Sequence, residues 1–133
     1  DGLKNINDTL GHLAGDAFIC HLAATIRRHA GPNAPVCRHG GDEFLAFFDH
    51  CDRMAAVKFA RQVIESLKDE ACLFSDKALR GTASAGVAVF PHNATNAEGL
   101  LQAADSAMYH AKMVGKACVA FRGKDEALEV VQT

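Results

Sequence analysis

The sequence RHGGDEF, residues 38–44, lies between two short apolar runs. Apolar runs on either side of paired glycines predict a β-hairpin whose tip carries Asp42 and Glu43. Gly40 and Gly41 tolerate positive φ and allow a ligand to approach the main chain closely. Neighbouring carboxylates repel each other unless a cation or hydrogen-bond donors lie beside them. Because hard cations take oxygen ligands, this tip suits a divalent metal that holds a polyphosphate, and an ordinary solvated turn is the alternative.

The composition is that of an ordinary one-domain globular protein. The chain has 133 residues, of which 49% are hydrophobic and 23% charged. A formal net charge of −2 indicates neither a nucleic-acid partner nor an anionic membrane surface. No apolar run approaches the ~20 residues needed to cross a bilayer. The five cysteines are scattered and include no C-x-x-C pair, which argues against a disulfide framework or zinc site and favours the reducing cytoplasm.

Helical and strand patterns alternate along the chain. Apolar spacing predicts a short helix and a turn within residues 1–16, then longer helices at about 14–29, 52–68 and 96–114. Short apolar and β-branched runs predict strands near 36–39, 44–48, 81–90 and 117–121. Between and after these elements we expect a loop or irregular strand over 69–79 and a charged tail, or the start of a linker helix, over 123–133.

This alternation, with one tight hairpin, predicts an α/β sandwich in which helices pack on a sheet that contains antiparallel pairs. A domain of this type needs a strand before its first helix, and no strand pattern precedes Leu3. We therefore expect residues 1–122 to form one domain, truncated at its N-terminus and without its first strand, followed by the tail.

Polar residues near the start of the chain suit recognition of guanine. Asn7, His12 and Asp16 could line one pocket if turns at Gly11 and Gly15 fold the segment back. A carboxylate accepts hydrogen bonds from the ring N–H and exocyclic amine of guanine, whereas adenine offers an acceptor where guanine offers a donor. The alternative is that Asn7 and Asp16 are helix caps.

Three lysines are candidates for phosphate contacts. Lys112 and Lys116 are four residues apart near the end of a predicted helix, so they are expected to share a helix face. Ammonium groups there could hold phosphate oxygens or simply offset the helix dipole. Lys4 is the third candidate, with a solvated surface lysine as its alternative.

Other polar residues have structural explanations. Asp105, in the middle of a predicted helix, could cap a neighbouring segment or pair with Arg38. Ser84 and Gly86 are expected to be packing devices that allow a helix to approach a strand closely.

Taken in order, these motifs resemble those of the GGDEF-domain diguanylate cyclases, which condense two GTP molecules into cyclic di-GMP. The signature is the run from Gly40 to Phe44, with the usual Arg38 before it. The upstream block D-x-F-K-x-x-N-D-x-x-G-H-x-x-G-D matches at Asp1, Lys4, Asn7, Asp8, Gly11, His12, Gly15 and Asp16, with Leu3 where Phe is common. An S-x-G strand motif matches at Ser84 and Gly86, and A-D-x-A-M-Y-x-A-K-x-x-G matches from Ala104 to Gly115.

The resemblance implies a mixed antiparallel sheet, like the palm of nucleotidyl cyclases and polymerases, flanked by helices. It implies that Asn7, His12 and Asp16 contact the guanine side of a GTP pocket. It also implies that Asp42 ligates a metal and accepts the 3′-hydroxyl proton, with Glu43 supporting the same catalytic metal site.

The resemblance further implies that Lys112 holds the terminal phosphates of GTP. Lys116 stands where the family usually has Arg, which keeps the charge but loses the bidentate fork. The implied cofactor is Mg²⁺ or Mn²⁺, and the implied partners are GTP, a second GGDEF domain during catalysis, and an upstream sensor domain. The implied location is the cytoplasm, or the cytoplasmic part of a membrane-anchored sensor.

The chain departs from the family pattern in two places. The other metal-binding Asp of the family normally lies two residues before Asp1, so the 133 residues alone are expected to be a weak or inactive enzyme. The product-inhibition motif R-x-x-D would fall at 31–34, which reads GPNA, so that site is expected to be absent. The alternatives to a cyclase are a non-catalytic GTP-binding module that regulates a neighbouring phosphodiesterase domain, and a protein-binding scaffold. The intact signature favours the enzyme.

Overall fold

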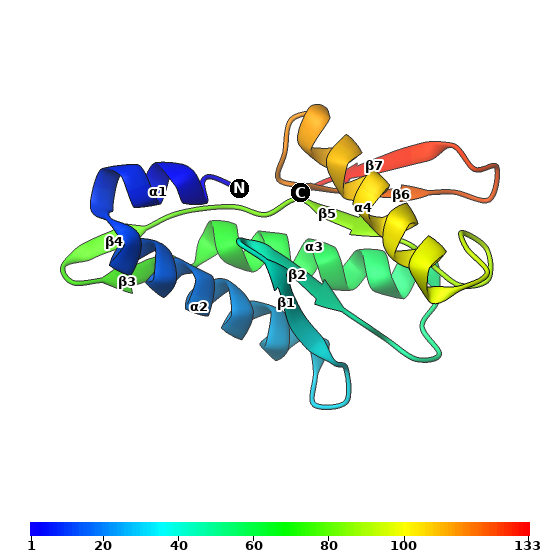
Figure 1. Cartoon of the computed structure of the whole chain (residues 1–133), viewed down its shortest axis with the longest axis horizontal. Coiled ribbons are helices and arrows are strands. Elements are labelled where there is room, and N and C mark those ends of the chain that lie inside the picture. Colours follow the sequence, from blue (N-terminus) through cyan, green and yellow to red (C-terminus); the bar gives the residue numbers. More distant parts are fainter.

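The computed structural model describes all 133 residues, and its helices pack with three small, separate sheets (Figure 1). The helices are α1 (Leu3–Leu10), α2 (His12–Ala30), α3 (Arg53–Asp69) and α4 (Ala97–Met113). The strands are β1 (Val36–Gly40), β2 (Glu43–Ala46), β3 (Cys72–Phe74), β4 (Lys77–Leu79), β5 (Ala85–Val87), β6 (Cys118–Arg122) and β7 (Leu128–Gln132).

The three-stranded sheet has the order β5-β6-β7, with β5 parallel and β7 antiparallel to β6. Side chains alternate between the two faces of a strand, and β6 shows this directly. Val119 and Phe121 pack into a cluster with α3, whereas Cys118 and Ala120 pack into a cluster with α4. All four residues are buried, so β6 is covered by a helix on each face. The middle strand of the sheet thus contributes to two hydrophobic core clusters, one on each face.

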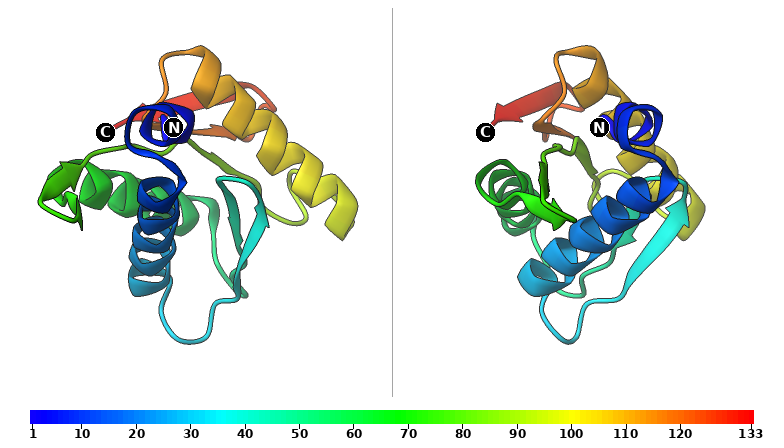
Figure 2. Two further views of the ribbon diagram at one scale, coloured as in Figure 1. Left: turned by 60° about the vertical axis from the view of Figure 1, so that its left-hand side comes forward. Right: turned by 90° about the vertical axis from the view of Figure 1, so that its left-hand side faces the viewer.

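Two further hydrophobic clusters contain residues from the first half of the chain. Leu22 and Ile26 of α2 pack against Val63 and Leu67 of α3. A separate cluster around Phe18 joins α1 and α2 to the β3–β4 hairpin. Figure 2 shows α1 lying across the start of α2, so that the N-terminus returns toward the middle of the molecule.

Polar caps and glycines set the ends of the long helices. Asp52 accepts a hydrogen bond from the main-chain nitrogen of Ala55 at 2.8 Å, so it is the N-cap of α3. Asn96 caps α4 in the same way through Gly99, at 2.7 Å. The connection after α2 begins at Gly31, whose φ of 83° suits a residue without a side chain.

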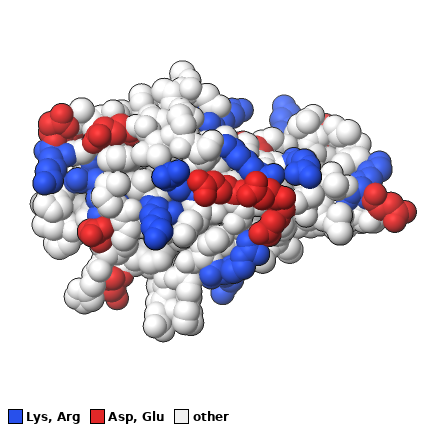
Figure 3. Space-filling view, turned by 180° about the vertical axis from the view of Figure 1, so that it is seen from behind, with Lys and Arg blue, Asp and Glu red and all other residues white.

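The hairpin of β1 and β2 forms where it is predicted, and it is a separate two-stranded sheet. The predicted class, helices packed on sheets with antiparallel pairs, is confirmed. No helix combines the length and the apolar character needed to span a membrane. Seen from behind, acidic and basic side chains are interspersed over the surface (Figure 3).

Three local predictions differ from the structure. Residues 69–79, expected to be a loop or an irregular strand, contain the regular β3–β4 hairpin. The strand expected over 81–90 is reduced to Ala85–Val87, because only this part has a hydrogen-bonded neighbour, β6. The segment expected to be a charged tail, or the start of a linker helix, instead contains β7 (Leu128–Gln132), which pairs with β6. Leu128 and Val130 pack beside the buried alanines of α4, which stabilises a strand that its own sequence scarcely indicates.

Candidate active site

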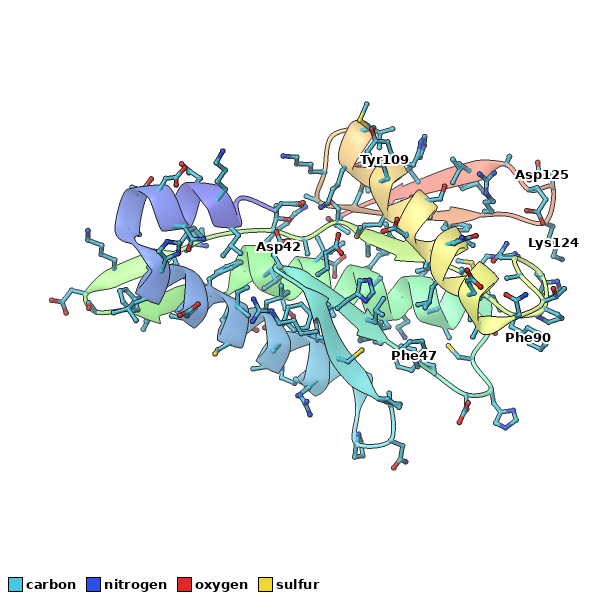
Figure 4. All side chains as sticks on the ribbon, viewed as in Figure 1. Asp42, Phe47, Phe90, Tyr109, Lys124 and Asp125 are labelled. Atoms are coloured by element: carbon cyan, nitrogen blue, oxygen red, sulfur yellow. The ribbon has the colours of Figure 1, made fainter.

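Asp42 lies at the exposed tip of the β1–β2 hairpin, which points toward the middle of the molecule (Figure 4). The pairing shifts between Arg38 and Gly40, which marks a bulge, and Gly40 then pairs with Glu43. Gly41, at the turn, has a φ of 40°. The Arg38 Nε donates to the carbonyl oxygen of Gly41 at 2.7 Å, so the arginine fixes the turn that carries Asp42.

Neither of the two roles considered for Asp105, capping a neighbouring segment or pairing with Arg38, is observed. The Arg38 side chain turns back onto its own hairpin, and Asp105 forms neither an ion pair nor a side-chain hydrogen bond. Asp105 is exposed on α4, where solvation alone satisfies the carboxylate.

A cavity of about 430 Å³ brings Asp42 together with lysines from separate parts of the chain. The residues that line it are Asp1, Gly2, Leu3, Lys4, Asn5, Asp8, Asp42, Lys112 and Lys116. Only one of them is hydrophobic, so the cavity suits a strongly charged ligand. Its walls come from the start of α1, the hairpin tip, and the end of α4 with the turn that follows.

The charges around the cavity act on one another. Asp1, Asp8 and Asp42 line the cavity together with Lys4, Lys112 and Lys116. The main-chain nitrogen of Asp1 donates to the carbonyl oxygen of Thr82 at 2.9 Å. The cavity therefore holds cations and carboxylates within electrostatic reach of each other.

The two lysines near the end of α4 are placed differently from the prediction. Lys112 is in the last turn of α4, but the helix ends at Met113, so Lys116 lies in the following turn and the two do not share a helix face. Both nevertheless line the cavity. Lys112 can offset the helix dipole as well as contact a ligand, whereas Lys116 lies outside the helix.

The candidates for guanine recognition lie outside this cavity, at the corner between α1 and α2. The buried Gly15 lies against the side-chain oxygen of Asn7, where any larger residue would collide with the amide. Asp16, the next residue of α2, is exposed. Neither residue is a cap, because Gly2 precedes α1 and Gly11 precedes α2 without a side-chain hydrogen bond, so the capping alternative is wrong. His12, the first residue of α2, is exposed.

The residues placed around the hairpin tip are not equivalent. Glu43 is half-buried on β2 and, unlike Asp42, does not line the cavity. Gly40 and Gly41 are exposed at the turn and have nothing within 4 Å of the position that a side chain would take, so a ligand could approach the backbone there.

The cavity also includes residues that sequence reasoning did not select. Asp8 is four residues after Lys4 on α1, so the helical period alone could have placed both on one face. Asp1 and Asn5 complete the α1 side of the wall. No pattern in the sequence indicates that Asp1 and Ser84, distant in the chain, form a hydrogen bond at 2.9 Å.

A metal at this site would need ligands beyond those of the protein. No group of three or more His, Cys, Asp or Glu residues in the chain is arranged to hold a metal ion. Mg²⁺ in nucleotide sites is usually bound through one or two carboxylates together with substrate phosphates. The exposed Asp42 carboxylate, in a cavity with three lysines that suit phosphate, fits that kind of shared coordination.

Residues 1–118 match the family described as "Diguanylate cyclase, GGDEF domain". Diguanylate cyclase A of Treponema denticola is 30% identical over 116 residues, which is 87% of this chain and 31% of the relative. Cyclic di-GMP phosphodiesterase NbdA of Pseudomonas aeruginosa is 31% identical over 87% of this chain and 15% of its own length. The chain thus spans less than a third of these relatives.

The fold agrees with that family. The crystal structure of the GGDEF domain of YfiN (TpbB) from Pseudomonas aeruginosa superposes with a TM-score of 0.85 at 33% identity, covering 91% of this chain and 76% of that one. The chain belongs to the GGDEF-domain family, whose named members include diguanylate cyclases.

Proposed function

We propose that this chain is the catalytic domain of a diguanylate cyclase that converts two GTP molecules into cyclic di-GMP and two pyrophosphates. One observation carries the proposal: the exposed Asp42 shares a cavity with Lys4, Lys112 and Lys116, which come from elements far apart in the sequence. A carboxylate able to take a proton, beside cations able to hold phosphates, is the pairing that nucleotidyl transfer needs.

The residues have distinct roles in this proposal. Lys112, Lys116 and Lys4 hold the β- and γ-phosphates, and the exposed backbone of Gly40 and Gly41 allows them to approach the hairpin. Asp42 accepts the 3′-hydroxyl proton of the attacking ribose. Asp42 and the phosphates would hold a divalent ion, Mg²⁺ or Mn²⁺, with support from Glu43. Such an ion would neutralise the negative charge on the phosphates.

The base is bound at the other end of the site. Asp16 accepts hydrogen bonds from the ring N–H and exocyclic amine of guanine, and the Asn7 amide can both donate and accept. His12, the first residue of α2, contacts the same side of the nucleotide. Lys4 and Asn7 are three residues apart on α1, so one helix face leads from the phosphate cavity to the base corner. This face explains how one nucleotide could reach both groups of residues.

The reaction requires two displacements. In each, the 3′-oxygen of one GTP bonds to the α-phosphorus of the other, the bond from that phosphorus to the β-phosphate oxygen breaks, and pyrophosphate leaves. Two such steps close the ring. Because each chain offers one cavity of this kind, we propose that two domains face each other during catalysis. The five free cysteines favour a cytoplasmic location. Membership of the GGDEF family supports the further proposal of a sensor domain upstream.

The alternative is a GTP-binding module without turnover that regulates a phosphodiesterase domain. The similarity to a cyclic di-GMP phosphodiesterase favours keeping it as the second candidate. Incubating the full-length protein with GTP and Mg²⁺ and separating the products by chromatography distinguishes the two. Cyclic di-GMP formed with two equivalents of pyrophosphate supports the cyclase. Saturable GTP binding without either product supports the regulatory module.

A further inference from the structure

Ser84, just before β5, connects two segments that line the phosphate cavity. Its hydroxyl donates to the Asp1 Oδ2 at 2.9 Å and accepts from the main-chain nitrogen of Ala117 at 3.2 Å. A hydroxyl has one donor and two acceptor positions, so both contacts form at once. Gly86 is the packing residue predicted for this strand, because a side chain there would collide with the backbone of α4. Ser84 has a polar role instead.

The turn that Ser84 contacts has an unusual backbone. Gly115, Lys116 and Ala117 have φ values of 136°, 66° and 53° in succession. Left-handed conformations are unfavourable for residues with a side chain, so Lys116 and Ala117 need external contacts to stay there. The nitrogen of Lys116 donates to the carbonyl oxygen of Ala111 at 3.0 Å. The Ala117 nitrogen is bound by Ser84, and its carbonyl oxygen accepts from Thr133 Oγ1 at 2.8 Å.

We propose that Ser84 is a positioning residue for triphosphate binding: its hydroxyl holds Ala117, and thereby keeps the exposed Lys116 directed at the cavity that also contains Asp42. This inference rests on the proposed function, in which the cavity holds the phosphates of GTP. Ser84 does not line the cavity and acts only through the turn and through Asp1.

The first test measures the turn itself and needs no nucleotide. In Ser84→Ala the Ala117 N–H loses its acceptor, so its hydrogen-exchange protection, measured by NMR, should fall at least tenfold. Ser84→Thr keeps the hydroxyl and should restore the protection. Ser106→Ala is the matched control, because it removes a hydroxyl from an exposed position on α4. Unchanged protection in Ser84→Ala would overturn the inference, whatever the protein does with GTP.

The second test asks whether Ser84 acts through Lys116. Ser84→Ala should weaken GTP binding several-fold in calorimetry and leave GMP binding unchanged, because GMP lacks the phosphates that Lys116 would hold. In a Lys116→Ala background, Ser84→Ala should cause no further loss. Equal losses for GTP and GMP, or losses that add in the double variant, would show a general structural role and overturn the inference.

The two tests separate this inference from the proposed function. If the chain bound no GTP while Ser84→Ala still lost protection at Ala117, the proposed function would fail and the anchoring of the turn would stand. If GTP bound and turned over normally in Ser84→Ala, the function would stand and the positioning role would fail.

Discussion

At the scale of single residues, replacing Asp42 should change catalytic activity and leave stability almost unchanged. Asp42→Ala removes a carboxylate from an exposed turn in which it makes no hydrogen bond, so the free energy of unfolding should change by no more than about 0.5 kcal/mol. Loss of the proton acceptor should lower cyclic di-GMP formation by about 10²–10⁴-fold. Asp76→Ala, in the β3–β4 turn, is the matched control for both measurements. Retained turnover in Asp42→Ala would contradict the catalytic role.

In the proposed function, base recognition depends on another exposed carboxylate, Asp16. A hydrogen bond to a charged group contributes about 1.5–3 kcal/mol, so Asp16→Ala should raise the Kd for GTP roughly ten- to a hundredfold. The Kd for ATP should change less, because adenine presents an acceptor where guanine presents a donor. Calorimetric titration with both nucleotides measures this difference. An equal loss for GTP and ATP would mean that Asp16 does not contact the base edge.

At the scale of secondary-structure elements, the contact of β5 with α4 fixes where the lysine-bearing turn begins. A side chain at Gly86 would collide with the carbonyl oxygen of Ala104 and the main-chain nitrogen of Met108. Gly86→Ala should therefore destabilise the chain by about 1–3 kcal/mol in denaturant unfolding. Gly40→Ala is the control for stability, since nothing lies within 4 Å of the added methyl group. Similar unfolding midpoints for the two variants would show that α4 can shift without cost.

Elements with a strong periodic pattern were predictable, and elements defined by a partner were not. The three long helices combine apolar spacing with clear caps such as Asp52, and both signals are local in sequence. In contrast, β7 is a strand because it pairs with β6 and packs beside α4, and no local signal reports those neighbours. The same reason applies to the site. Sequence motifs identified Asp42 and the lysines, but only the fold shows that Ser84 contacts the turn that contains Lys116.

At the scale of the whole molecule, buried thiols should make the protein less stable as the pH becomes alkaline. Burial raises the pKa of Cys72 and Cys118 above the usual value of 9.0. In the unfolded chain these thiols ionise near pH 9, whereas in the folded chain they ionise only at a higher pH. Their contribution to the free energy of unfolding should therefore be fully present below about pH 9 and should fall as the pH rises above it. Urea midpoints measured from pH 7 to 10 would show this. The Cys72→Ala, Cys118→Ala double variant should lose stability less steeply with pH than the original chain. Equal slopes would contradict the role of the thiols.

Turnover should require two chains, because each contributes one phosphate cavity and one Asp42. A ring closed by two displacements needs each 3′-hydroxyl to face the α-phosphate held by the other chain, an arrangement that two-fold symmetry provides. The rate per chain should therefore rise with protein concentration before it levels off. Sedimentation at the same concentrations would show whether the rise follows dimer formation.

Mixing variants tests the same requirement more directly. With an excess of Asp42→Ala, most wild-type chains would pair with a chain that cannot accept the second proton. Such mixed pairs should release one pyrophosphate and accumulate the linear dinucleotide in place of the ring. An equal excess of Asp76→Ala should leave cyclic di-GMP formation unchanged, because that variant keeps Asp42 and every residue of the cavity. A rate per chain that is independent of concentration and indifferent to excess Asp42→Ala would mean that one chain completes both displacements.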